Sequence, residues 1–294
     1  MDYVAQIRNI PKKCDFFIGF DSDGCVFDTM EIKQKECFSP SFIKHFGMQA
    51  ASKYAREVWE FVNLYSKNRG CNRFVAVRQA LDLIKERKVF RERGMKTPDM
   101  PILTQWLKEE TKLGNPTLEA KIKKENHEDL KVLLAYSKEV NERIADMVYG
   151  IPPFPGVRQV LEKAYGKADM IVVSQTPLEA LKREWEENKI DHFLSLIAGQ
   201  EHGTKTEHLR YATEGKGYAP EKILMVGDAP GDLKAAKANN ALFYPIIPGR
   251  EEESWKNFAE EGIDRFFKGT FKGAYQDRLM DEFDRSLPEK PSWN

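Results

Sequence analysis

Two aspartates stand one residue apart directly after the first apolar segment of the chain. The segment Phe16–Phe20 is apolar and aromatic, and Asp21-Ser22-Asp23-Gly24 follows it. Such a run predicts a buried strand that opens into a loop at its C-terminal end, the edge where α/β sheets bind ligands. An extended backbone points both carboxylates to the same side, where like charges require a cation, and paired oxygen ligands suit Mg²⁺. The alternative interpretation is a plain turn, since Asp, Ser and Gly are common turn residues.

Polar residues also stand at three later positions where apolar strands are expected to end or helices to begin. They are Ser174-Gln175-Thr176, Lys205, and Gly227-Asp228-Ala229-Pro230-Gly231-Asp232. If the strands are neighbours in a parallel sheet, these groups converge on one crevice. Carboxylates, a hydroxyl and an ammonium leave room for a phosphate, whose oxygens backbone N–H groups, the hydroxyl and the ammonium would bind.

Each of these later residues also has a purely structural interpretation. Ser174 is a candidate helix N-cap, as on any strand–helix unit. Lys205 can be an ordinary exposed lysine, and Asp232 can simply favour a helix N-terminus through the helix dipole.

Composition excludes several classes of protein. The chain has 46 Lys plus Arg and 46 Asp plus Glu, so its formal net charge of zero argues against a nucleic-acid binder. Its four cysteines form no CxxC pair, which is typical of reduced thiols in the cytoplasm. We also expect no signal peptide and no membrane span, because the N-terminus is charged and no apolar run is long enough.

The distribution of patterns predicts two domains. From about Glu31 to Tyr149 helical periodicity dominates, with stripes that begin at Val58, Phe74 and Leu133. After a boundary rich in proline and glycine at 150–156, strand and helix patterns alternate, as in a mostly parallel sheet covered on both faces. We therefore predict an α/β core over residues 1–29 and 150–294, with an all-helical module over 30–149 inserted after the first strand.

The order of the motifs resembles the haloacid dehalogenase-like hydrolase superfamily. The pattern of that superfamily is Asp-x-Asp after a strand, Ser or Thr after a strand, a lysine, and Gly-Asp-x-x-x-Asp after a strand. It occurs here as Asp21/Asp23, Ser174, Lys205 and Asp228/Asp232. The third motif departs from the usual Lys-Pro because Thr206 follows Lys205, so Lys216 and Lys222 are rival candidates. The resemblance implies a Rossmann-like three-layer core and makes the inserted module a cap over the site.

The resemblance also implies roles for these residues. Asp21 would be the nucleophile that forms an aspartyl-phosphate, and Asp23 the general acid and then the general base. Mg²⁺ would be held by Asp21, the Asp23 carbonyl and Asp228, with Asp232 helping directly or through Lys205. Ser174, with the backbone near Gln175, would bind phosphoryl oxygens together with Lys205.

The inserted module contains one unusual segment, the basic and amide-rich stretch 66–74 between two predicted helices. We predict that Arg69, Asn72 or Arg73 contacts the phosphate or the polar body of the substrate. The alternative is a solvated turn between helices in which Asn72 is a helix N-cap.

We therefore expect a cytoplasmic, Mg²⁺-dependent phosphatase that acts on a small phosphorylated metabolite. A phosphosugar mutase or a phosphonatase of the same superfamily is an alternative enzyme. A module that binds phosphorylated ligands without catalysis is the alternative from another class, and the intact Asp21/Asp23 pair argues against it. The sequence predicts no oligomeric state.

Overall fold

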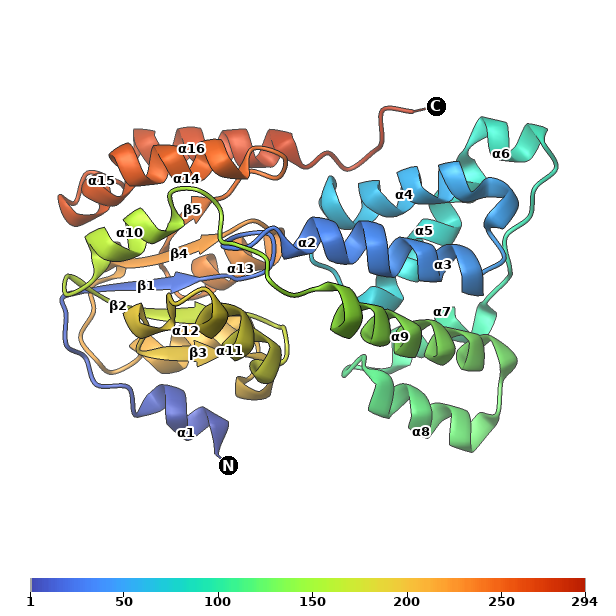
Figure 1. The fold of residues 1–294 in the computed structure, drawn as a ribbon, viewed down its shortest axis with the longest axis horizontal. Coiled ribbons are helices and arrows are strands. Elements are labelled where there is room, and N and C mark those ends of the chain that lie inside the picture. The colour runs from blue at the N-terminus through green and yellow to red at the C-terminus, as the bar shows by residue number, and fades with distance from the viewer. Residues whose placement is uncertain (1, 294) are drawn as a thin grey trace. The chain divides into compact units, whose positions relative to one another are not determined.

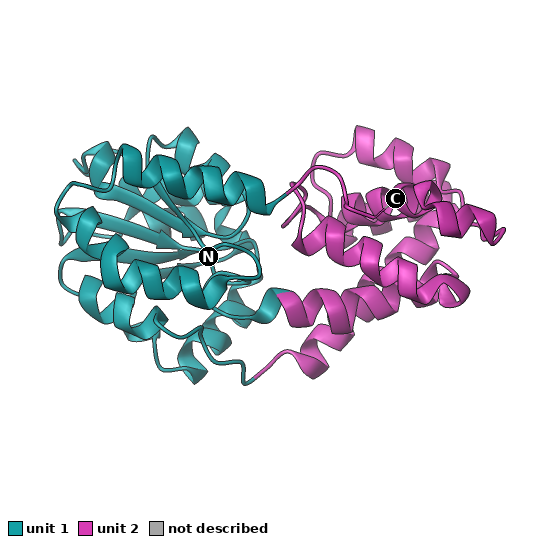
Figure 2. Cartoon of the chain, turned by 90° about the horizontal axis from the view of Figure 1, so that it is seen from above, with its two compact units in different colours: residues 1–30, 150–287 teal, residues 31–149, 288–294 magenta. Residues whose placement is uncertain are grey.

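The computed structural model describes residues 2–293, which form two compact units (Figure 2). The α/β unit contains the chain up to Met30 and Gly150–Leu287, and the helical unit contains Glu31–Tyr149 and the residues after Leu287. The predicted core ran to residue 294, whereas the contacts place the last residues with the helical unit. There the Lys67 N–H donates to the Pro288 carbonyl at 3.3 Å, and the Trp293 ring packs edge-on against Phe61.

The α/β unit is built on five parallel strands in the order β3-β2-β1-β4-β5 (Figure 1). The central strand β1 (Phe16–Phe20) lies between β2 (Ala168–Val173) and β4 (Ile223–Gly227), with β3 (Leu196–Ala198) and β5 (Leu242–Pro245) at the edges. Because all strands run in one direction, the carboxyl ends of β1, β2 and β4 meet at one edge of the sheet. The predicted fold class, a Rossmann-like α/β core with a mostly parallel sheet, is confirmed.

Helices cover both faces of the sheet because strand side chains alternate between them. The α-helices of this unit are α1 (Tyr3–Arg8), α10 (Val157–Ala164), α11 (Leu178–Glu187), α12 (Lys205–Thr213), α13 (Pro230–Ala238), α14 (Glu251–Asn257), α15 (Ile263–Phe267) and α16 (Ala274–Ser286). Ile18 and Phe20 pack in one core with α10 and α11, and Phe17 packs in the other core with α12 and α13.

In the helical unit, described residues 31–149 contain helices and turns but no strand. The three predicted stripes lie on α4 (Ser52–Leu64), α5 (Arg73–Glu86) and α9 (Glu128–Met147). The other helices are α2 (Thr29–Ile32), which begins in the α/β unit, α3 (Ser39–His45), α6 (Lys88–Glu92), α7 (Pro101–Glu109) and α8 (Asn115–Glu125), with a π-helix at Lys33–Phe38. Among the described residues, none of the helices is both long and apolar enough to cross a bilayer.

Helix α1 precedes the first strand and packs against the α/β unit. The Asp2 carboxylate caps it by accepting a hydrogen bond from the Ala5 N–H, and Ile7 is buried in the core. A helix this short is not stable alone, so its contacts with the α/β unit stabilise it. One of these contacts is the edge-on packing of the Tyr3 ring against His202.

Behind His202 lies a second buried histidine, His208 of α12. The two ring centroids are 6.2 Å apart, and neither ring nitrogen of His208 has a hydrogen-bond partner among the described residues. Burial, together with the nearby positive charge of Lys205 and of protonated His202, lowers the pKa of His208 to about 4. The folded protein therefore disfavours the protonated form of His208.

This burial predicts a specific loss of stability in mild acid. The unfolded chain protonates His208 near its ordinary pKa of 6.5, whereas the folded chain does so only near 4, so stability present above pH 6.5 is lost as the pH falls toward 4. The variant His208→Leu has no imidazole to protonate at this position. Between pH 6.5 and pH 4, we therefore expect the wild type to lose up to about 3 kcal/mol more of its free energy of unfolding than the variant loses. Urea denaturation at several pH values measures the difference, with the exposed His192→Leu as control. Parallel pH curves for wild type and His208→Leu would contradict the prediction.

Candidate active site

The loop after β1 holds Asp21 in a fixed, buried position. The Asp21 N–H continues the sheet by donating to the Val226 carbonyl at 2.9 Å, and the Ser22 N–H donates to Asp21 Oδ1 at 2.8 Å. The Ser22 side chain is itself buried, where its hydroxyl accepts a hydrogen bond from Trp185 Nε1 at 3.0 Å and donates to Glu184. Asp21 is 4% exposed, so these contacts set the direction of its carboxylate.

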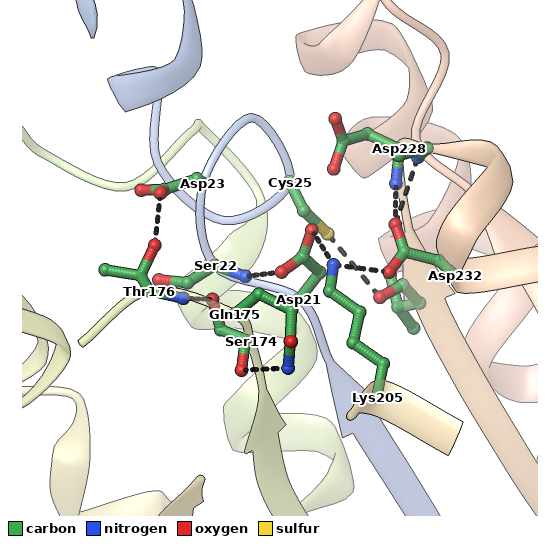
Figure 3. A network of polar contacts seen from close by, with 12 residues as sticks. Asp21, Ser22, Asp23, Cys25, Ser174, Gln175, Thr176, Lys205, Asp228 and Asp232 are labelled. Carbon is green, nitrogen blue, oxygen red and sulfur yellow. Dashed lines mark hydrogen bonds and ion pairs between the residues drawn. The ribbon is translucent and has the colours of Figure 1, made fainter. Parts of the chain in front are cut away.

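Lys205 forms ion pairs with two aspartates, Asp21 and Asp232 (Figure 3). Its Nζ lies 2.8 Å from Asp21 Oδ2 and 2.6 Å from Asp232 Oδ1. Asp232 Oδ2 accepts hydrogen bonds from the Asp228 and Ala229 N–H groups at the start of α13. Lys205 opens α12, whose start is fixed by a capping box between Thr204 and Glu207.

Lys205 lies beside a cluster of three carboxylates. Oxygens of Asp21, Asp228 and Asp232 all lie within 4.8 Å of one another, and all three side chains are buried. Burial raises the pKa of Asp21 and Asp232, and neighbouring carboxylates raise it further, although Lys205 lowers it in both. These two carboxylates in turn raise the pKa of Lys205, despite its burial, so it stays protonated. Three hard anionic ligands and one ammonium form a set that fits a divalent cation such as Mg²⁺.

Asp23 has a different environment from Asp21. Its Oδ1 accepts a hydrogen bond from the Thr29 hydroxyl at 2.6 Å, and its Oδ2 accepts one from the Thr176 hydroxyl at 2.7 Å. The sequence singled out neither threonine as a site residue. Thr176 stands next to Gln175 in a segment already recognised as polar, but no local signal marked Thr29.

Ser174 and Gln175 lie in the loop after β2, beside Thr176 (Figure 3). The Ser174 N–H donates to the Ala198 carbonyl at 3.0 Å, and its hydroxyl accepts a hydrogen bond from the Thr176 N–H at 3.2 Å. The Gln175 side chain donates to the Gly203 carbonyl at 2.8 Å. Ser174 does not cap a helix, because the N-cap of α11 is Pro177.

The rival lysines lie in other places. Lys216 donates to the Ile7 carbonyl, and Lys222 pairs with Asp15 at 3.6 Å. Of the three candidate lysines, Lys205 is the one whose ammonium contacts the aspartates of the site.

The three residues predicted to contact substrate in the helical unit also hold that unit together. Arg69 is buried and donates to the Leu64 carbonyl, and Asn72 is the N-cap of α5, accepting from the Phe74 N–H at 3.0 Å. Arg73 donates to Ser137 and to Asn141 of α9 at 2.7 Å. Their contact with a substrate stays a prediction.

Fold and site together define a class of α/β protein, in which carboxylates, a hydroxyl and a lysine gather where the central parallel strands end. The family model described as haloacid dehalogenase-like hydrolase matches residues 92–244. This match spans more than half of the chain, and the protein belongs to that family of hydrolases. The matched range includes Ser174, Lys205, Asp228 and Asp232 and begins after Asp21.

Comparison with solved structures returns weakly similar chains. A haloacid dehalogenase-like family hydrolase from Streptococcus pneumoniae is 14% identical, with a TM-score of 0.43 over 82% of this chain and 90% of the other. A predicted phosphatase from Clostridium acetobutylicum is 17% identical, with a TM-score of 0.43 over 88% and 99%. A predicted phosphoglycolate phosphatase from Haemophilus somnus is 16% identical, with a TM-score of 0.42 over 80% and 86%. No curated protein sequence matches significantly.

The position of Asp232 depends on a glycine at the end of β4. A Cβ on Gly227 would lie 2.4 Å from the Cβ of Asp232, far closer than atoms can approach. We expect Gly227→Ala to displace Asp232 and to destabilise the protein by on the order of 2 kcal/mol, as overpacking does in a core.

Gly231→Ala is the matched control for this prediction, because a Cβ there meets no atom within 4 Å. Its melting temperature should equal or slightly exceed that of the wild type, since alanine is the better helix former. Thermal denaturation followed by circular dichroism compares the two variants. Equal melting temperatures for Gly227→Ala and Gly231→Ala would refute the close approach.

Proposed function

We propose that the protein is a Mg²⁺-dependent phosphomonoesterase that acts through an aspartyl-phosphate on Asp21. The observation that carries this proposal is the buried Asp21 carboxylate, which Lys205 holds in a cluster with the carboxylates of Asp228 and Asp232. The ion pair with Lys205 favours the ionised form of Asp21, and a carboxylate in that form attacks phosphorus without an activating base once a cation offsets the charge of the phosphate.

The residues present fit Mg²⁺, which prefers oxygen ligands. Asp21, Asp228 and the main-chain carbonyl of Asp23 would hold the ion. Asp232 would act through Lys205, because both of its oxygens already accept hydrogen bonds. When bound, Mg²⁺ supplies charge neutralisation between the nucleophile and the phosphoryl group.

Asp21 and Asp23 divide the chemistry. An Asp21 oxygen forms a bond to phosphorus, the ester P–O bond breaks, and Asp23 gives its proton to the departing alcohol oxygen. Asp23 then takes a proton from water, the water oxygen bonds to phosphorus, and the bond between phosphorus and Asp21 breaks. The products are the alcohol and inorganic phosphate, and both aspartates return to their starting states.

Ser174, Gln175 and Lys205 would bind the transferring phosphoryl group. The Ser174 hydroxyl and the backbone N–H groups near Gln175 would donate to its oxygens, and Lys205 would add a positive charge. Each of these groups comes from a loop or helix that follows a strand, which supports the assignment.

The helical unit would act as a cap that closes over a small phosphorylated substrate, such as a sugar phosphate, a phosphoglycolate-like acid or a nucleotide. Arg69, Asn72 and Arg73 stay the predicted contacts to that substrate. The cytoplasmic location also stays a prediction. All four cysteines are free thiols, which is compatible with it.

Hydrolysis of p-nitrophenyl phosphate in the presence of Mg²⁺ tests this function. Asp21→Asn should lower kcat by on the order of 10³-fold or more, because it removes the nucleophile. Asp15→Asn, an exposed aspartate just before β1, is the matched control and should keep wild-type activity. Chelation of the metal should abolish turnover by the wild type.

Mass spectrometry of acid-quenched enzyme should also find phosphate on the peptide that contains Asp21. A wild-type protein without activity on a panel of phosphate esters would favour a module that only binds phosphorylated ligands. Full activity of Asp21→Asn would exclude the mechanism.

A further inference from the structure

The carboxylate of Asp23 is clamped by hydroxyls from two segments of the chain. Thr29 donates to one oxygen at 2.6 Å, and Thr176 donates to the other at 2.7 Å. Thr176 is 153 residues distant along the chain and comes from the loop after β2. A carboxylate held on both oxygens has a fixed plane, which a single hydrogen bond would not give it.

Thr176 is itself held by its neighbours. Its N–H donates to the Ser174 hydroxyl, and its carbonyl accepts a hydrogen bond from the Gln200 N–H at 3.1 Å. Gly199 packs so closely beneath the loop that a Cβ there would lie 2.8 Å from the Thr176 carbonyl oxygen. The hydroxyl therefore points at Asp23 from a preorganised backbone, as Figure 3 shows.

We propose that Thr176 is a positioning residue for proton transfer, because its hydroxyl holds the Asp23 carboxyl group in the orientation that serves the departing alcohol. This inference rests on the proposed function, since the orientation of Asp23 matters only if Asp23 moves a proton. Thr176 acts through Asp23 and forms no bond to the reacting atoms.

A positioning role makes a prediction that a merely structural role does not make. Alkyl phosphates need a proton on the departing oxygen, whereas p-nitrophenolate leaves as a stable anion without one. Misplacement of Asp23 should therefore slow the alkyl ester more than the aryl ester. Direct binding of phosphate by Thr176 would weaken both esters equally, because they share the same phosphoryl group.

The experiment compares kcat/KM for p-nitrophenyl phosphate and for a simple alkyl phosphate, in the presence of Mg²⁺. Thr176→Val removes the hydroxyl but keeps the branched shape, and Thr176→Ser keeps the hydroxyl. The control is Thr213→Val, because that half-buried threonine donates only to the Leu209 carbonyl in α12. Thermal denaturation shows whether each variant is folded.

We expect Thr176→Val to lower kcat/KM for the alkyl ester at least about tenfold more than for the aryl ester, since general acid catalysis contributes about 10²- to 10⁴-fold. Thr176→Ser should restore most of the loss, and Thr213→Val should leave both esters unchanged. If Thr176→Val is unfolded, the comparison of Thr176→Ser with Thr176→Ala decides the question by the same ratio.

The outcomes separate this inference from the proposed function. If the wild type is active and Thr176→Val lowers kcat/KM for both esters equally, or for neither, the positioning role is wrong. The proposed phosphatase function then still stands. A wild type that hydrolyses neither ester overturns the proposed function and this inference together.

Discussion

The ion pairs of Lys205 with Asp21 and Asp232 are the interactions on which the site depends. A half-buried lysine between two buried carboxylates is stable only if the backbone holds all three at short distances, since the charges lose much of their hydration. The loop after β1, the start of α12 and the start of α13 hold the three side chains. Asp228 belongs to the same cluster, in which oxygens of Asp21, Asp228 and Asp232 lie within 4.8 Å of one another. Such a set of oxygen ligands fits a divalent cation.

Parallel strands make this assembly possible because they bring distant parts of the chain to one edge. Asp21 and Asp232 lie far apart in sequence, with the whole helical unit between them, yet the strands that precede them, β1 and β4, pair directly. Ordering so long a chain costs conformational entropy, and the two apolar cores on the faces of the sheet offset that cost. The polar residues can therefore be arranged for chemistry while apolar residues stabilise the fold.

Much of this was predictable from sequence because it depends on local patterns. Apolar runs predicted the strands that end before Asp21, Ser174 and Asp228, which are β1, β2 and β4. The motif order, taken together with the family resemblance, brought Asp21, Lys205 and Asp232 into one proposed site, and the structure places them in contact. Such predictions are reliable for parallel strands, because residues that follow the carboxyl ends of those strands lie at the same edge of the sheet.

Features that depend on contacts between distant residues were not predictable. Helix α1 is too short to form by propensity, and it exists because Ile7 and Tyr3 pack on the α/β unit. The bond from Thr176 to Asp23 depends on the packing of Gly199 beneath the loop, which no local pattern encodes. We predicted that the residues after Leu287 belong to the α/β core. They belong instead to the helical unit, where the Arg87 guanidinium stacks on the Trp293 ring.

The proposed cation site formed by Asp21, Asp228 and Asp232 is tested most directly by thermal unfolding with and without Mg²⁺. We predict that Mg²⁺ raises the melting temperature of the wild type, because an ion that binds only the folded state stabilises it. Asp228→Asn should lose this response to Mg²⁺, whereas the exposed Asp277→Asn should respond like the wild type. A wild type that does not respond to Mg²⁺, or an Asp228→Asn variant that responds as the wild type does, would contradict the account.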